Sequence, residues 1–282
     1  METIGRSRRC IDWRKSSRTS ITGHPLISTM STTYLVTGTT RGIGHAIVRA
    51  LLVRPSTTVI AGVRDSAHAA AQALTSLPRD DSSRLIVLAL DAADLAAPFQ
   101  AVAKLQSEHG IDVVDVVIAN AAAGESGNTI LQTDLESVGH HVAINTTAPL
   151  ALLQATAPLL RKSANPKFIG IGSELGSVAK IEGMAASPWP RTTSPYGLTK
   201  AALNWVVRTA HFEEPWLTAV VVTPGLVKTD MAAFAVKDSG IGLDALGAIT
   251  TEESAEGVLK AVDRASRDGP GFLKYDGGEV PW

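Results

Sequence analysis

The stretch Thr33–Gly44 (TYLVTGTTRGIG) joins a β-branched, apolar run to three glycines at positions 38, 42 and 44. The run Thr33–Thr37 predicts a strand, and the residues from Gly44 onward predict a helix. Glycines at this junction allow a tight turn and let backbone N–H groups at the helix start approach a pyrophosphate. A glycine trio alone is a weak signal, and a plain turn is the alternative. Its position between a first strand and a first helix favours a dinucleotide site.

Short apolar runs and longer helical patterns alternate along the rest of the chain. Further strands are predicted at Thr57–Ala61, Leu85–Leu90, Val113–Ala119, Lys167–Ile171, Leu217–Thr223 and, as a seventh, Gly271–Tyr275. Helices are predicted at Gly44–Leu52, Leu95–Glu108, Thr133–Leu160 and Pro195–Phe212, with capping residues at Thr133, Ser194 and Thr250. Continuously apolar strands indicate that both sheet faces are covered. The predicted fold class is α/β, a doubly wound parallel sheet (Rossmann-type) of about seven strands in a single domain, residues 32–282.

Residues 1–31 differ in composition from this domain. Before Met30, six basic residues stand against Glu2 and Asp12, and the segment lacks the apolar stretch of a secretory signal. We interpret 1–31 as a disordered extension; an upstream start ahead of Met30 and an organelle transit peptide are the alternatives. The only cysteine, Cys10, lies here, which excludes an internal disulfide and a cysteine-based metal site.

Charge and hydropathy point to a small-molecule partner. The net charge of −1 gives no general attraction to nucleic acid or to an anionic membrane, and no apolar run reaches the roughly 18 residues of a spanning helix. We therefore expect a cytoplasmic protein with neither nucleic acid nor membrane as partner. The adjacent His140 and His141 point about 100° apart on a helix, so a solvated helix face is expected there and no metal site.

The end of the second strand bears on the choice of dinucleotide. NAD sites usually place a carboxylate here for the ribose hydroxyls, but this chain has Val63 followed by Arg64. Arg64 and Arg41 predict a two-sided clamp on the 2′-phosphate of NADP(H), because guanidinium groups match phosphate geometry. Asp65 is the competing candidate for a ribose contact, which would favour NAD; its alternative role is to cap the next helix.

Polar or small residues also follow the third and fourth predicted strands. Asp91 is a candidate acceptor for the adenine amino group, and a helix cap is the alternative. The run Asn120–Gly124 consists of Asn120, three alanines and a glycine, whose small side chains leave space for the cofactor to cross the sheet edge.

The fifth strand ends at Ser173, and the helix after it carries Tyr196 and Lys200. Residues four apart lie on one helical face, so both side chains are predicted to point into one cleft. A free tyrosine has a pKa near 10. A lysine ammonium beside it is expected to lower that pKa toward the working range. Ser177 is a rival for Ser173, but Ser173 is nearer the strand end and fits a Gly-Ser-x-x-Gly pattern through Gly176.

The glycine turn is followed along the chain by Asn120, Ser173, the Tyr196–Lys200 pair and Pro224-Gly225. Their order and spacing resemble those of the short-chain dehydrogenase/reductase superfamily over Thr33–Gly225. Within it, TTVIAGVRD and the ending YDGGEVPW are similar to fungal norsolorinic acid ketoreductase-like reductases. The resemblance implies that Tyr196 is the general acid, that Ser173 donates a hydrogen bond to the substrate carbonyl, and that Lys200 also binds the nicotinamide ribose. Asn145 would anchor a water-mediated proton relay to that lysine. Cofactor contacts are implied for Gly38, Thr40, Arg41, Gly42, Ile43, Gly44, Arg64, Asp91, Asn120, Tyr196, Lys200, Pro224, Gly225, Val227 and Thr229.

Three departures from the family pattern stand out. Ala122 replaces the usual glycine of the Asn-Ala-Gly turn, a mild change because alanine is also small. Glu174 follows the serine, where an acid could disturb nearby pKa values. The chain between Ser173 and Tyr196 is longer than expected, and the extra residues, Met184–Thr193, either line the substrate pocket or form a surface insertion.

These observations predict NADPH-dependent reduction of a carbonyl, or the reverse oxidation of a secondary alcohol. The apolar, glycine-containing segment Met231–Ile249 is suitably placed for a lid, which favours a bulky, apolar or aromatic metabolite. Two alternatives keep the fold: reduction of an enoyl double bond, and a non-catalytic NADP(H)-binding protein. The resemblance also implies a homodimer or homotetramer that pairs the helices Thr133–Leu160 and Pro195–Phe212.

Overall fold

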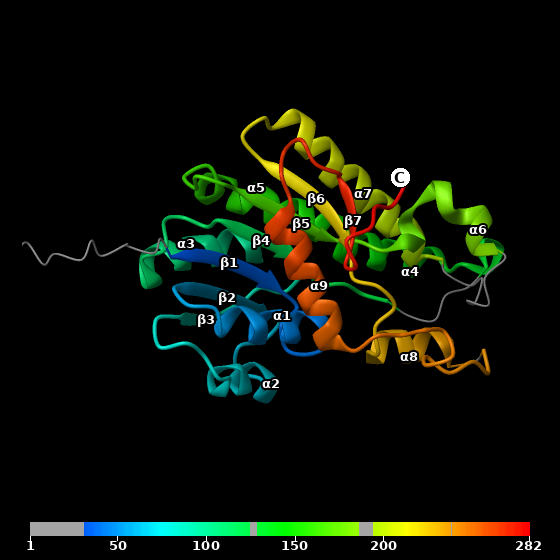
Figure 1. The fold of residues 1–282 in the computed structure, drawn as a ribbon, viewed down its shortest axis with the longest axis horizontal. Coiled ribbons are helices and arrows are strands. Elements are labelled where there is room, and N and C mark those ends of the chain that lie inside the picture. Colours follow the sequence, from blue (N-terminus) through cyan, green and yellow to red (C-terminus); the bar gives the residue numbers. More distant parts are fainter. Residues whose placement is uncertain (1–30, 125–128, 186–193, 238) are drawn as a thin grey trace, which may run out of the picture.

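Seven parallel strands form one sheet in the order β3-β2-β1-β4-β5-β6-β7 (Figure 1). The computed structural model describes residues 31–124, 129–185, 194–237 and 239–282, so the expected extension 1–31 lies outside them except for Ser31. The strands are β1 (Thr32–Thr37), β2 (Thr57–Val63), β3 (Arg84–Ala89), β4 (Val116–Ala119), β5 (Lys167–Ile171), β6 (Thr218–Thr223) and β7 (Phe272–Lys274). The predicted doubly wound parallel sheet is confirmed.

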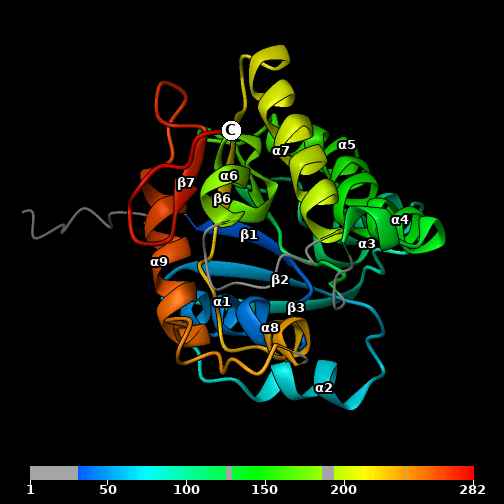
Figure 2. The same cartoon turned by 90° about the vertical axis from the view of Figure 1, so that its right-hand side faces the viewer.

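Helices cover both faces of this sheet (Figures 1 and 2). One face carries α1 (Gly42–Leu52) and α9 (Thr251–Arg264), and the other carries α3 (Ala97–His109), α5 (Ala148–Leu160) and α7 (Tyr196–Glu213). The shorter helices are α2 (Ala69–Gln72), α4 (Leu135–Val142), α6 (Ile181–Ala185) and α8 (Asp230–Val236). Within the described ranges, no helix is long and apolar enough to cross a membrane.

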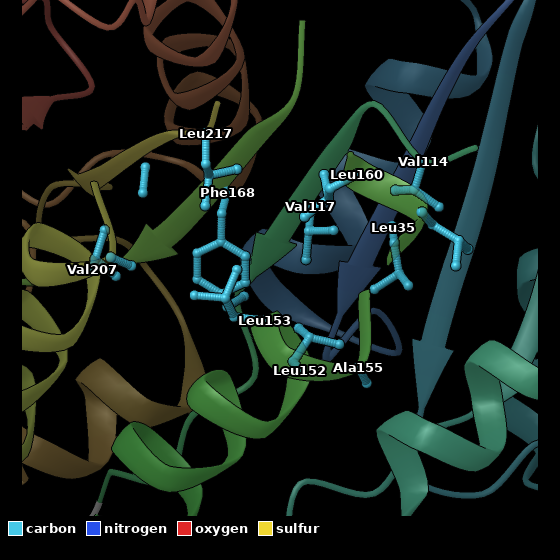
Figure 3. Close-up of a cluster of buried hydrophobic side chains, with 14 of the residues drawn as sticks. Leu35, Val114, Val117, Leu152, Leu153, Ala155, Leu160, Phe168, Val207 and Leu217 are labelled. Carbon is cyan, nitrogen blue, oxygen red and sulfur yellow. The ribbon is translucent and has the colours of Figure 1, made fainter. Parts of the chain in front are cut away.

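The strands are mostly apolar because they bury side chains on both faces. Leu35, Val117 and Phe168 belong to the cluster beneath α3, α5 and α7, while their strand neighbours Val36 and Ile118 belong to the cluster beneath α1 and α9. Figure 3 shows Phe168 among side chains of α5 and α7. Each fully buried side chain of this size stabilises the fold by about 1.5–3 kcal/mol, so the two clusters fix the sheet that carries the site.

One strand starts later than predicted. The apolar run from Val113 predicts a strand there, but β4 begins at Val116. The carboxylate of Asp115 accepts hydrogen bonds from Thr33 N–H at 2.8 Å and from Ser163 Oγ at 2.5 Å. The backbone of Asp115 also pairs with Thr33 O and Lys167 N, whereas Val114 N donates to Leu159 O of α5 at 3.4 Å. The strand pairing therefore does not extend back to Val113, which stays exposed. The other strands agree with prediction to within two residues at each end, and β5 agrees at both ends.

The predicted helix Thr133–Leu160 is three consecutive pieces: α4, a π-helical turn at Ala143–Thr147, and α5. Its cap is Asp134 rather than Thr133, because the Asp134 carboxylate accepts from two N–H groups of the first turn. The Thr133 hydroxyl instead donates to Ser194 Oγ at 2.7 Å. Ser194 therefore does not cap α7, whose first residue is Tyr196.

All seven parallel strands end at one edge of the sheet, and α4, α6 and α8 lie beyond that edge (Figures 1 and 2). The strand order reverses between β1 and β4, where a crevice for ligands is expected in such sheets. The segment after β6 includes α8. A parallel bridge between Val227 and Ile249 joins the two ends of this segment. The cap predicted at Thr250 is confirmed, since its Oγ1 accepts from Glu253 N at 3.1 Å.

Candidate active site

The turn between β1 and α1 requires its glycines. Gly38 and Gly42 have φ angles of +69° and +58°, a region that favours glycine. A Cβ on Gly44 would lie 2.3 Å from Gly38 O, so a side chain does not fit there. The first turn of α1 has no acidic residue and no side-chain cap. Its N–H groups and positive dipole end therefore suit an anionic group such as a pyrophosphate.

Asn120 supports this turn from β4. Its Nδ2 donates to Thr37 O at 2.8 Å and to Gly38 O at 3.2 Å, and its backbone N donates to Thr37 Oγ1 at 3.0 Å. A Cβ on Gly44 would also lie 2.4 Å from Asn120 Nδ2. Asn120 was predicted as a cofactor residue; in this structure its side chain holds the glycine turn in shape.

The two predicted arginines lie after β1 and β2. Arg64 is exposed, and within the described residues it makes no hydrogen bond or ion pair. Arg41 pairs with Asp230 at 2.7 Å, and the two side chains are 76% and 80% exposed. An ion pair this exposed contributes only about 0–1 kcal/mol, so breaking it costs little. The last residue of β2 is the buried Val63, which leaves no carboxylate at that strand end.

Asp65 and Asp91 both close local turns. Asp65 Oδ1 accepts from Ala67 N at 2.8 Å, and the cap of α2 is His68, so the helix-cap alternative for Asp65 is wrong. Asp91 Oδ1 accepts from Ala93 N at 3.0 Å, ahead of the start of α3. Short side chains that bond two residues ahead stabilise turns of this kind.

The segment after β6 returns to the glycine turn. Gly225 has a φ of +83°, and a Cβ there would lie 2.7 Å from the Tyr275 ring. Thr229 caps α8, and its Cγ2 is 3.6 Å from the position that a Cβ on Gly42 would take. With the Arg41–Asp230 pair, this contact brings the start of α8 against the start of α1. The predicted residues 224–229 and 38–44 thus meet at one edge of the sheet.

Ser173 and Tyr196 meet beyond β5. The Tyr196 phenol and the Ser173 side chain share a hydrogen bond, and Ser173 Oγ also accepts from Leu175 N at 3.2 Å. Burial raises the pKa of Tyr196 to about 12, against the lowering effect of the Ser173 hydrogen bond. The rival Ser177 is buried and donates to Pro281 O at 2.6 Å, so its hydroxyl is engaged elsewhere.

Lys200 lies beneath the tyrosine ring. Its Nζ is 5.5 Å from the Tyr196 ring centroid and donates to Ile171 O at 2.7 Å. Burial lowers the pKa of Lys200 to about 8. The pKa of Tyr196 is raised rather than lowered, because burial outweighs the other influences and Lys200 is not among the causes of the shift. Burial opposes the charged form of both groups, so it raises the pKa of the phenol and lowers that of the ammonium.

Asn145 joins the loop after β4 to α7. It is fully buried in the π-helical turn; its Oδ1 accepts from Ala123 N at 2.8 Å and its Nδ2 donates to Ala123 O at 2.9 Å. The same Nδ2 donates to Thr199 Oγ1, which in turn donates to Tyr196 O. The water-mediated relay stays a prediction. Thr199, which links Asn145 to the tyrosine, was missed, although its position beside Lys200 could have indicated it.

Glu174, the acidic residue that follows Ser173 in the sequence, directs its side chain toward the edge strand β7. Its carboxylate pairs with Lys180 and, at 3.3 Å, with Lys274 of β7. Burial favours the neutral acid, but the two lysines outweigh it and hold the pKa of Glu174 below its usual range. The expected disturbance is absent at Tyr196, whose pKa shift has other causes.

Two further expectations concern residues beside the site. His141 is fully buried, with Nδ1 2.8 Å from Ser137 O, so the solvated face predicted for the histidine pair holds only for His140. Of the predicted insertion, Met184 and Ala185 end α6, and residues 186–193 lie outside the described residues.

Comparisons with known proteins agree with this architecture. A family model described as short chain dehydrogenase matches residues 32–240. The chain is similar to a norsolorinic acid ketoreductase from Dothistroma septosporum, with 41% identity over 89% of this chain and 92% of the relative. A norsolorinic acid ketoreductase from Emericella nidulans is 38% identical over 90% of this chain and 95% of the relative. Among solved structures, an NADPH-bound carbonyl reductase from chicken fatty liver has a TM-score of 0.77 and 30% identity, over 90% of this chain and 100% of the other.

Proposed function

The chain belongs to the short-chain dehydrogenase family of oxidoreductases, and from that premise we propose that it uses NADPH to reduce the carbonyl group of a bulky, apolar or aromatic metabolite. The observation that carries the proposal is the hydrogen bond between Ser173 and Tyr196, with Lys200 beneath the ring. This group lies at the same sheet edge as the glycine turn, whose free N–H groups suit an anion. A cytoplasmic location is part of the proposal.

The chain's own residues divide the chemistry between them. When bound, the nicotinamide cofactor would supply the hydride. The glycine turn and the start of α1 would hold its pyrophosphate, and Lys200 would bind its ribose. Ser173 donates a hydrogen bond to the substrate carbonyl oxygen, and Tyr196 gives its phenolic proton to that oxygen. Burial raises the pKa of Tyr196, so the phenol holds at neutral pH the proton that it would give to the substrate.

Exposed apolar side chains near Tyr196 support a bulky substrate. Leu131 and Leu135 are 95% and 83% exposed. They flank Thr133, which hydrogen-bonds Ser194, two residues before Tyr196. A large apolar molecule would cover such side chains and gain the free energy of removing them from water. The names of the fungal relatives, which refer to reduction of norsolorinic acid, support the ketoreductase assignment.

Matched substrates test the proposal against its two alternatives. NADPH consumption is measured with an aromatic ketone, and with a conjugated enone and an enoyl ester of the same carbon skeleton, each product being identified. We expect the ketone to give the secondary alcohol and the enone to give the allylic alcohol. Saturated products would establish enoyl reduction instead, and NADPH binding without turnover of any substrate would favour a binding protein.

Cofactor preference is predicted to depend on Arg64. NADPH should bind more tightly than NADH, because the exposed Arg64, together with Arg41 once it leaves its exposed pair with Asp230, would engage a 2′-phosphate. Arg64→Asp should weaken NADPH binding about 10- to 100-fold, the range expected for loss of a hydrogen bond to a charged group, and should leave NADH binding less affected. Fluorescence titration at low salt measures both affinities. Equal affinities for NADH and NADPH in the unmodified protein would refute the clamp.

Assembly is predicted from the outer face of α7. Leu198, Trp205 and Phe212 recur every seven residues and are 46%, 69% and 63% exposed, an apolar stripe that a second copy would cover. We expect a homodimer or homotetramer, and Trp205→Glu should shift it toward monomer. Light scattering at micromolar concentration is the measurement. A monomeric unmodified protein would remove this part of the proposal.

A further inference from the structure

The turn that carries Ser173 rests on Asn204. Asn204 lies on α7, one helical turn after Lys200, and is 4% exposed. Its Nδ2 donates to Gly176 O at 3.1 Å. Its Oδ1 is 3.4 Å from the position that a Cβ on Gly172 would take. This buried side chain therefore bonds one end of the turn Gly172–Gly176 and lies beside the other, with Ser173 between them.

The two glycines leave this turn little freedom to shift. A Cβ on Gly172 would lie 2.3 Å from Val221 Cγ1, and one on Gly176 would lie 2.6 Å from the carbonyl carbon of Lys200. Gly176 N donates to Ser173 O at 2.9 Å, which closes the turn. Because the backbone packs directly on α7, a displacement of Gly176 is passed on to Ser173.

Packing alone does not explain why a polar residue, Asn204, occupies this buried position. Within the described part of the chain, its Oδ1 is buried and has no hydrogen-bond partner. An unsatisfied buried polar group destabilises a protein. Leucine, of similar size and shape, would fill the space without that cost, although it would leave Gly176 O unpaired. The hydrogen bond to the turn is therefore the feature that leucine cannot supply.

We propose that Asn204 is a positioning residue, which holds Ser173 at hydrogen-bonding distance from Tyr196. Tyr196, Lys200 and Asn204 are spaced by four on one face of α7, so a single rigid helix carries the proton donor, the lysine and the anchor of the serine turn. The inference deepens the proposed function and rests on its assignment of Ser173 and Tyr196.

The test follows the Tyr196 phenol by NMR and needs no substrate. The chain has three tyrosines, so ¹³C labelling at the ring carbon bonded to oxygen gives three signals, and Tyr196→Phe identifies the one from Tyr196. Asn204→Leu should move this signal in the same direction as Ser173→Ala and should leave the other two in place. In the Ser173→Ala background, Asn204→Leu should add little further shift. The ketone assay, where it gives turnover, should show kcat about tenfold lower with the KM for NADPH unchanged.

His211→Leu is the matched control. It also removes a buried hydrogen-bonding side chain from α7, but one that contacts Ala219 rather than the serine turn, so the Tyr196 signal should stay in place. If Asn204→Leu does not fold, Asn204→Ser, too short to reach Gly176, takes its place. The proposal is overturned if the Tyr196 signal stays at its wild-type position, or if the shifts of Asn204→Leu and Ser173→Ala simply add. Failure of the proposed function alone would leave the NMR shifts intact and abolish only the kinetic effect.

Discussion

Replacing Tyr196 by phenylalanine is expected to lower carbonyl reduction by about 10²-fold or more, the range for removal of a positioned acid–base group. Only a hydroxyl is lost, and with it the hydrogen bond to Ser173, whereas the ring that lies against Lys200 stays. The fold and the affinity for NADPH should therefore be retained. Steady-state kinetics, a thermal melt and an NADPH titration measure the three quantities on the same sample.

Tyr34→Phe provides the matched control for this substitution. Tyr34 is buried in β1, away from the carboxyl edge of the sheet, and its phenol hydrogen-bonds Arg54. The same chemical change there should leave turnover within about twofold, with any effect confined to the melting temperature. Full activity of Tyr196→Phe on a substrate that the wild type reduces would show that the proton comes from another group.

Lys200→Met is expected to weaken NADPH binding about 10- to 100-fold, because a hydrogen bond from a charged donor is lost. Turnover should fall as well. At neutral pH the ammonium is present, and it stabilises the phenolate left after Tyr196 gives up its proton. Since burial lowers the pKa of Lys200 to about 8, the ammonium is present below that pH and lost above it. Wild-type affinity for NADPH should therefore decline as the pH rises through 8, and the variant should show no such step.

Lys167→Met separates this effect from the removal of any buried lysine. Lys167 is 5% exposed, and its Nζ donates to Val262 O and Asp263 O at the end of α9. This variant should lose stability but keep NADPH affinity and its pH dependence. If Lys200→Met binds NADPH as tightly as the wild type across the pH range, Lys200 has no part in holding the cofactor.

The strands were predictable because both of their faces are buried, which leaves a continuous apolar run in the sequence. The error at β4 arose where the backbone before Asp115 leaves the sheet, since Val114 N donates to Leu159 O of α5 rather than to a neighbouring strand. The helix over 133–160 was drawn as continuous because its composition does not mark the π-helical turn. That turn is visible only through the contacts of Asn145 with Ala123 and Thr199, from distant parts of the chain.

The sequence predicted which residues form the site, but not the direction in which the pKa of Tyr196 is shifted. Ser173, Tyr196 and Lys200 come together as their place after β5 and on α7 predicted. The direction of the Tyr196 pKa shift depends on how deeply the phenol and the ammonium are buried, and burial is a property of the packed structure. Asn204 was missed for the same reason, because its significance lies in the turn that packs against it.

Isotope transfer from the cofactor tests the central claim most directly. A conjugated enone is incubated with the protein and NADPH that carries deuterium on the transferable position of the nicotinamide ring, and the product is examined by mass spectrometry and NMR. Carbonyl reduction predicts one deuterium on the carbinol carbon of an allylic alcohol, and Tyr196→Phe should nearly abolish that product. Deuterium on the carbon β to an intact carbonyl would contradict the account, because it would show that the same fold reduces the double bond instead.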